Sequence, residues 1–388
     1  MKPSERLSRI APYLFADLEN KIAERKAAGV DVISLGIGDP DTPTYPAIIA
    51  AAQQAVADPG AQQYPSNRGR QDFRDAMAAF YERRFGVTLD PKDEIMPAVG
   101  AKECIFNLNL AFLDPGDVAL ASDPGYPAYT SGPIIAGADV VEMPLVPELG
   151  FAPDLDAIAP EDRKRAKLMF INYPNNPTGA IVPDGFFERV VEFAREHDIL
   201  VVHDNAYSEV TYDGYVAPSF LATPGAKDVG VEVFSLSKGY NMTGWRCGAI
   251  VGNAEAISHY WRLKSNVDSG LFEAVQLAAV TALSPAVDAD VARMNAIYAR
   301  RRDLVCDALR AAGVDVTPPK GTIYIWAPVP AGFESSAAYC AHVLERSAVV
   351  ISPGGAYGSS GEGWFRISLT TPDDRLAEAV QRLGSLSA

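Results

Sequence analysis

Short apolar segments alternate with helical patterns through the middle of this chain, and this alternation restricts the fold more than any other feature. Five segments are rich in Val, Ile, Leu and Phe and are bounded by Gly, Pro, Asn or Asp: 117–123, 166–174, 199–207, 231–237 and 248–253. Their length and composition predict buried strands. Between two of them, apolar residues recur at helical spacing over 184–198. Strands alternating with helices predict an α/β fold with a mostly parallel central sheet and helices on both faces.

The pattern changes after about residue 284. A long amphipathic helix at 289–313 is followed by short apolar strands at 322–329, 348–354 and 364–370. A chain of 388 residues exceeds one comfortable hydrophobic core. We therefore expect an N-terminal arm (1–45) that packs with the small domain, a large domain (46–284) and a small α+β domain (285–388). A helix around 255–284 is expected to join the two domains.

The net charge of −15 disfavours nucleic acid and anionic membranes as partners, because both require a basic surface. The basic cluster at 162–167 is typical of a solvated helix end. Charges and proline interrupt the first 19 residues, so we expect neither a signal peptide nor a membrane span.

The cysteines and histidines do not form a pattern typical of metal binding. Cys104, Cys247, Cys306 and Cys340 lie far apart without a CxxC pair, and the four histidines do not cluster. We expect reduced core cysteines, a cytoplasmic protein and no metal.

Polar residues follow three of the predicted strands, in "NYPNNPTG", "HDNAYSE" and "SLSKGYNMTGWR". Ligands of such sheets bind beyond the carboxyl ends of the strands. Lys238 stands in the third motif between serines and Arg246. A lysine at the mouth of a site can bond covalently to a carbonyl carbon, although a lysine in a loop is more often simply solvated.

Asp204 lies within the apolar strand 199–207, where an unpaired carboxylate would be costly to desolvate. A protonated pyridine nitrogen would be a suitable partner, and an aspartate there keeps such a ring able to accept electrons. A buried salt bridge or a helix cap is equally compatible with this position.

Groups able to bind an anion accumulate in the same region. The segment 99–106 predicts a turn from strand to helix, whose free N–H groups favour a phosphate. Ser235, Ser237 and Arg246 could complete that site, although each serine alone is typical of a simple turn.

Together, and in this order, these motifs resemble the fold-type I pyridoxal-phosphate enzymes of the class I/II aminotransferase family. The resemblance extends from "SLGIGDPD" at 34–41 to "FRISLT" at 365–370. It implies that Lys238 carries the cofactor and moves a proton between substrate and cofactor, and that Asp204 pairs with the pyridine nitrogen. Other residues implied to hold the cofactor are Asn176 and Tyr207 at the ring hydroxyl, Tyr126 against the ring, and Ala101, Lys102, Ser235, Ser237 and Arg246 at the phosphate. Tyr64 is implied to reach the phosphate of the partner subunit in a homodimer.

The resemblance also implies how an amino-acid substrate binds. Phe365, Ile367 and Leu369 share one face of a predicted strand, so Arg366 projects from the other. An arginine on such a strand is normally solvated, but the family uses one here to bind the substrate α-carboxylate, together with Asn176 and the backbone of Gly38. "GIGDPD" lacks the third glycine of a dinucleotide fingerprint, so a nicotinamide cofactor is not expected.

Several further segments, among them "PYLFADLENK", "DPGYPAY" and "GEGWFRISL", resemble the LL-diaminopimelate aminotransferase family. That family makes a lysine precursor from tetrahydrodipicolinate with glutamate as amino donor. The resemblance implies that Tyr13 contacts the substrate. It also implies that Asn67 contacts the substrate. Plant-type members carry a glutamate at this position, where its charge binds the distal ammonium group. Asn67 is neutral, so that charge-assisted contact is lost or replaced.

Three alternatives stay open or are disfavoured. The chain could be a broader aminotransferase for aspartate, alanine or glutamate, or a C–S β-lyase that uses the same residues and releases ammonia and pyruvate. A cofactor-binding regulator without turnover is not expected, because only about thirty residues precede "SLGIGDPD" and leave no room for a DNA-binding module.

Overall fold

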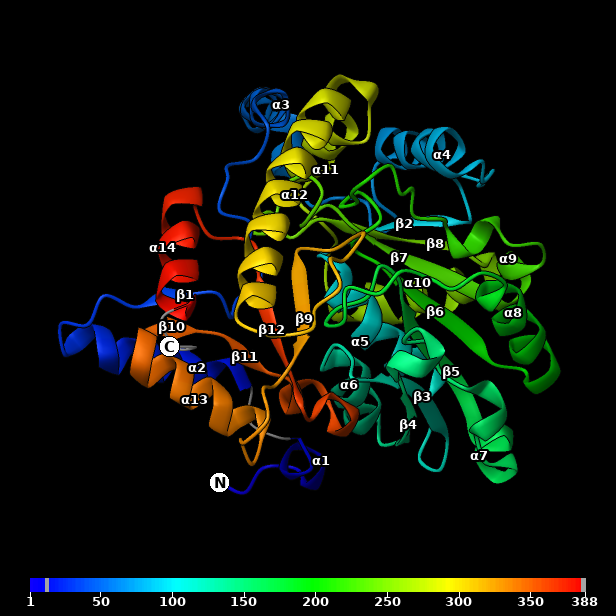
Figure 1. Ribbon diagram of the computed structural model, residues 1–388. Helices are drawn as coiled ribbons and strands as arrows, with labels where there is room; N and C mark the ends of the chain where they lie inside the picture. Colours follow the sequence, from blue (N-terminus) through cyan, green and yellow to red (C-terminus); the bar gives the residue numbers. More distant parts are fainter. Residues whose placement is uncertain (11–13, 385–388) are drawn as a thin grey trace.

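The computed structural model describes residues 1–10 and 14–384, and a seven-stranded sheet forms its centre (Figure 1). The strands are β2 (Ile95–Ala98), β3 (Val118–Asp123), β4 (Asp139–Pro144), β5 (Ala166–Asn172), β6 (Leu200–Asn205), β7 (Gly230–Ser235) and β8 (Gly248–Gly252). Their order is β2-β8-β7-β6-β5-β3-β4, and only β8 runs antiparallel to its neighbours. The predicted mostly parallel sheet is thus confirmed.

The two edge strands, β2 and β4, were not among the predicted strands. β2 has only four residues and contains Pro97, which interrupts the usual strand signal. β4 is largely exposed or half-buried, so it lacks the continuous apolar run of the central strands. The short length and proline of β2, and the exposure of β4, therefore explain why these strands were missed.

Helices cover both faces of this sheet. They are α3 (Pro46–Ala57), α4 (Gln71–Phe85), α5 (Ala101–Phe112), α6 (Ala128–Ala136), α7 (Pro160–Arg165), α8 (Phe186–His197), α9 (Ala226–Val229), α10 (Ala254–Val267) and α11 (Glu273–Ala282). Residues along β3 alternate between two cores, since Leu120 belongs to the core that contains residues of α4 and α8, while Ala121 belongs to the core that contains residues of α5, α6 and α10. α8 buries the apolar stripe that the sequence predicted.

The predicted joining helix at 255–284 is wrong as a single element. α10 ends at Val267, and α11 begins at Glu273. Gly270 between them has φ +93°, a left-handed conformation that a continuous α-helix cannot contain.

The C-terminal part contains α12 (Asp288–Ala311), β9 (Tyr324–Pro328), α13 (Ser336–Ser347), β10 (Val349–Val350), β11 (Ser352–Pro353), β12 (Trp364–Ser368) and α14 (Asp373–Gly384). β11, β12 and β9 form an antiparallel sheet. The N-terminal segment contributes α1 (Glu5–Ser8), α2 (Leu14–Ala27) and β1 (Ile33–Ser34), and β1 pairs with β10. In Figure 1, α2, β1, β10, α13 and α14 lie together on the left, whereas α1 lies at the lower edge and contacts α6. The limits of the domains stay predictions.

Among residues 1–10 and 14–384, no single helix has both the length and the apolar composition needed to cross a bilayer. The bent pair Glu273–Ala282 and Pro285–Ala311, at 69° to each other, meets that test only jointly and only by length and composition.

Candidate active site

A cavity of about 360 Å³ lies where β5, β6 and β7 end. Twelve of the predicted site residues line it: Gly38, Ala101, Lys102, Tyr126, Asn176, Asp204, Tyr207, Ser235, Ser237, Lys238, Arg246 and Arg366. Tyr64 and Asn67 do not line it and are exposed. Tyr13 lies outside the described residues. One cavity thus brings together side chains that are up to 328 residues apart, between Gly38 and Arg366.

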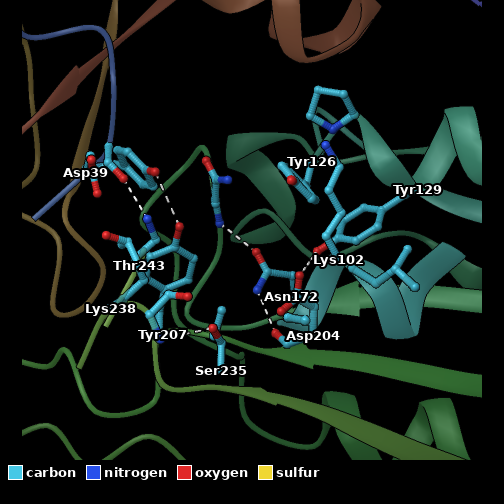
Figure 2. A pocket seen from close by; sticks show the side chains of 18 of the residues that line it. Asp39, Lys102, Tyr126, Tyr129, Asn172, Asp204, Tyr207, Ser235, Lys238 and Thr243 are labelled. Atoms are coloured by element: carbon cyan, nitrogen blue, oxygen red, sulfur yellow. Dashed lines mark hydrogen bonds between the residues drawn. The ribbon is translucent and has the colours of Figure 1, made fainter. Parts of the chain in front are cut away.

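Lys238 is held at the end of β7 by contact with the N-terminal segment. Its Nζ donates a hydrogen bond to the carbonyl oxygen of Gly38 at 2.6 Å. Figure 2 shows Lys238 and Tyr207 on one side of the cavity, Tyr126 and Tyr129 on the other, and Asn172 and Asp204 between them in this view. The amine is therefore fixed inside the cavity, where it can reach a bound molecule.

Asp204 combines burial with few hydrogen bonds. Its Oδ2 accepts a hydrogen bond from the Tyr129 hydroxyl at 2.8 Å, whereas its buried Oδ1 has no partner. Burial raises the pKa of the Asp204 carboxyl to about 6, although Tyr129 and His203 lower it. Within the described part of the chain it joins no ion pair and caps no helix. A cationic N–H group in the cavity would satisfy this carboxylate.

Substitution of Asp204 by Asn should change how stability depends on pH in the cofactor-free protein. The folded-state pKa of Asp204 lies above the ordinary 3.8, so its ionisation destabilises the fold as pH rises through about 6. That difference corresponds to roughly 3 kcal/mol. We expect Asp204→Asn to match the wild type below pH 4 and to exceed its free energy of unfolding by up to about 3 kcal/mol at pH 8. Denaturant unfolding at both pH values checks this, and equal pH profiles would contradict it.

Cationic groups gather at the start of α5. Gly100 precedes this helix with φ +77°, and a Cβ there would lie 2.4 Å from an Arg246 guanidinium nitrogen. Glycine thus allows Arg246 to approach the free N–H groups of the helix. Burial, followed by the charge of Arg246, lowers the pKa of Lys102. Two cations beside a helix N-terminus favour an anion such as a phosphate.

Two serines at the end of β7 line the same cavity as this group. Ser235 and Ser237 are both buried, and the Ser237 backbone N–H donates to Ser235 Oγ at 3.2 Å. Lys102 also lies over the Tyr126 ring, with its Nζ 5.8 Å from the ring centroid. The phosphate-binding residues that the sequence predicted are therefore neighbours in space.

Arg366 is buried, so the solvated alternative for this strand residue is wrong. It is 2% exposed, and its guanidinium donates to Asn176 Oδ1 at 2.9 Å and to the Gly36 carbonyl oxygen at 2.8 Å. Its Cζ lies 3.9 Å from the ring centroid of Tyr324 and 4.6 Å from that of Tyr357. A guanidinium fixed between two rings is well placed to bind a carboxylate with two hydrogen bonds.

Several lining residues were missed in the sequence: Tyr129, Asn172, Tyr324 and Tyr357. Asn172 begins the motif "NYPNNPTG" at a strand end, and Tyr129 follows Tyr126 by three residues in "DPGYPAY". These positions could have marked both residues. Tyr207 donates a hydrogen bond to Tyr324 at 3.3 Å. Burial opposes ionisation of Tyr324, but the charges of Arg366 and Lys238 lower its pKa below the ordinary value. No motif marked Tyr324 or Tyr357, which come from the C-terminal part.

The arrangement fits the pyridoxal phosphate that the sequence resemblance implies. The cavity offers a fixed amine, a buried carboxylate oxygen without a partner, two cations at a helix start and an aromatic ring. Its volume is in the range of small-molecule sites. Each polar part of this cofactor therefore has a suitable group in the chain.

Comparison with known proteins gives one consistent answer. Residues 30–383 match the family described as aminotransferase class I and II. The LL-diaminopimelate aminotransferase of Desulforudis audaxviator is 54% identical over 98% of this chain and 96% of its own length. Substrate-bound BacF from Bacillus subtilis is a solved structure with a TM-score of 0.96 and 37% identity, covering 100% of this chain and 98% of its own. A mutant aspartate aminotransferase from Thermus thermophilus has a TM-score of 0.93 and 30% identity, with 100% of both chains covered.

Proposed function

The chain belongs to the aminotransferase class I and II family and is a pyridoxal-phosphate-dependent transaminase, and we propose that its substrate is LL-diaminopimelate. The proposed reaction converts tetrahydrodipicolinate and glutamate into LL-diaminopimelate and 2-oxoglutarate, a step of lysine biosynthesis. The observation that carries the proposal is the 54% identity, over nearly the full length of both chains, to an enzyme of that name. Identity to the aspartate enzyme is only 30%.

Pyridoxal phosphate, when bound, supplies an aldehyde that bonds amines and a ring that accepts electrons. Lys238 would bond to it until the substrate amine takes its place, and the freed Lys238 amine would then remove the proton from the substrate α-carbon. Asp204 would hold the pyridine nitrogen protonated, while Asn176 and Tyr207 bind the ring hydroxyl. The groups at the start of α5 would bind the phosphate.

Substrate binding is assigned to Arg366 and Asn176. Arg366 would bind the α-carboxylate, supported by Asn176, which already accepts one of its hydrogen bonds. The carbonyl oxygen of Gly38 accepts from Lys238 in this structure, so the backbone there lies beside the reacting amine. In this proposal Arg366 binds the carboxylate and the neighbouring Lys238 transfers the proton.

We propose a homodimer in which each subunit contributes to the site of the other. Tyr64 is 88% exposed and lies with Pro65 and Phe272 on a shallow surface away from the cavity. Phe272 is also exposed there, and contiguous exposed apolar patches often mark protein–protein contacts. Tyr64 and Asn67 would face the neighbouring active site from this surface.

Two further assignments belong to the proposal. A cytoplasmic location is supported by the four cysteines, which are all buried free thiols, because that compartment keeps thiols reduced.

The division into an arm, a large domain and a small domain at residues 45 and 284 is supported by the change from the parallel sheet to the antiparallel one.

A comparison of amino donors tests the proposed substrate. The purified protein is assayed with 2-oxoglutarate and LL-diaminopimelate, aspartate or alanine, and glutamate formation is measured. We expect kcat/KM for LL-diaminopimelate to exceed the others by at least about 100-fold, the ratio that about 2.7 kcal/mol of selective binding gives. A preference for aspartate or alanine would overturn the substrate assignment and leave the transaminase chemistry in place.

A further inference from the structure

A buried carboxylate outside the cavity connects the central sheet to the C-terminal part. Asp123 ends β3 and is 2% exposed. Its Oδ2 accepts three hydrogen bonds, from Ser359 Oγ at 2.9 Å, from the Ser360 N–H at 3.0 Å and from Ser360 Oγ at 2.8 Å. Both serines belong to the segment 354–361, which lies between β11 and β12. We call this segment the 354–361 loop.

The same contact is reinforced by the backbone. The Gly125 N–H donates to the carbonyl oxygen of Tyr357 at 2.8 Å. Gly358 has φ +136°, and a Cβ at this position would lie only 1.7 Å from Asp123 Oδ1. The loop therefore approaches Asp123 more closely than any residue other than glycine allows.

This arrangement is expensive for a residue with a purely structural role. Asp123 Oδ1 is buried without a hydrogen-bond partner, and within the described part of the chain no cation pairs with this carboxylate. Burying a carboxylate against uncharged donors costs free energy that an apolar side chain would avoid. A buried polar atom without a partner calls for an explanation in function or strain.

The explanation lies in what the loop carries. Tyr357 accepts the Gly125 hydrogen bond and precedes Ser359 by two residues. It lines the active-site cavity and places its ring 4.6 Å from the Arg366 guanidinium carbon. Its ring centroid also lies 6.2 Å from that of Trp326. Asp123 thereby fixes one of the two rings that enclose the guanidinium.

We infer that Asp123 is a positioning residue for substrate binding: through the 354–361 loop it holds Tyr357 against Arg366 and so keeps the guanidinium aligned for a carboxylate. This inference rests on the proposed role of Arg366 as the carboxylate-binding group. Asp123 itself does not line the cavity. Its loss should therefore weaken amino-acid binding and leave the chemical step nearly unchanged.

The first arm of the test uses the cofactor-free protein, so its result does not depend on activity. Hydrogen exchange is measured for the backbone N–H groups of Gly125 and of the loop in the wild type and in Asp123→Ala. Ser359→Ala/Ser360→Ala, which keeps the carboxylate but removes two donors, serves if Asp123→Ala fails to fold. Asp213→Asn is the matched control, because Asp213 joins Arg302 of α12 at 2.6 Å and lies outside the cavity.

We expect exchange in the loop to accelerate at least tenfold in Asp123→Ala and to stay unchanged in Asp213→Asn, because only the first removes the hydrogen bonds of the loop.

The second arm measures steady-state kinetics of the holoenzyme. KM for the amino donor should rise on the order of tenfold with kcat nearly constant, below the 100-fold cost of misplacing a reacting group by about 1 Å. Asp123→Asn, which keeps one acceptor oxygen, should restore most of the wild-type KM.

Unchanged loop exchange in Asp123→Ala would overturn the inference. So would a fall in kcat as large as the rise in KM, or an equal rise in KM in the control Asp213→Asn. If the loop loosens but KM does not move, the inference fails at Arg366, because Tyr357 would then not matter for alignment. A failure of the proposed function itself would appear separately, as absence of glutamate formation in the wild type.

Discussion

Lys238→Ala is expected to lose both turnover and the visible absorbance band of the cofactor-loaded enzyme. Lys238 is the lysine that the structure fixes next to the backbone of Gly38, and it is the proposed base at the substrate α-carbon. A positioned general acid–base group contributes about 10²- to 10⁴-fold, and loss of the covalent link to the cofactor adds to that. The fold should persist, because the side chain makes its hydrogen bond to a carbonyl at the edge of a cavity. Absorbance spectra, circular dichroism and single-turnover rates measure these three outcomes.

The matched control is Lys102→Ala, the other lysine of the cavity. Lys102 lies among the phosphate-binding groups, so its loss should weaken cofactor affinity while the absorbance band and turnover persist at saturating cofactor. The opposite outcome, with the band lost in Lys102→Ala and kept in Lys238→Ala, would show that the two roles have been assigned to the wrong lysines.

Arg366→Ala is expected to weaken amino-acid binding far more than cofactor binding. Truncating one member of a buried charge pair costs about 2 to 5 kcal/mol. Because Arg366 is 2% exposed between two tyrosine rings, that estimate applies to its pair with a bound carboxylate. KM for the amino donor should rise accordingly, and the cofactor dissociation constant should change little.

Arg366→Lys distinguishes geometry from charge. Lysine keeps the positive charge but not the planar fork that donates to Asn176 Oδ1 and the Gly36 carbonyl oxygen. We expect this variant to recover only a small part of the lost affinity. Equal losses of cofactor and amino-acid binding in both variants would instead indicate that Arg366 supports the fold.

The central strands could be predicted because each is buried on both faces and reads as an apolar run. β4 could not, since most of its residues are exposed or half-buried, and β2 could not, since it has only four residues and Pro97 opposes a strand assignment. The interruption between α10 and α11 was marked only by Gly270, because the helical pattern continues on both sides.

The candidate site could be predicted where motifs follow strands, as for Lys238 and Asp204. Tyr324 and Tyr357 could not be predicted in this way, because a tyrosine among apolar residues is more often part of a core. Their importance depends on Arg366, which the antiparallel sheet of the C-terminal part brings to the cavity. The burial of Arg366 likewise follows from tertiary packing and not from the local strand pattern.

The requirement for an amino acceptor tests the central claim, amino transfer at Lys238, most directly. The loaded enzyme is mixed with LL-diaminopimelate in the absence and presence of 2-oxoglutarate, and tetrahydrodipicolinate and free ammonia are quantified. Amino transfer predicts that product formation stops at about one equivalent per active site without the acceptor and becomes catalytic with it, without ammonia release. Product formation that continues beyond one equivalent per active site without the acceptor would contradict amino transfer.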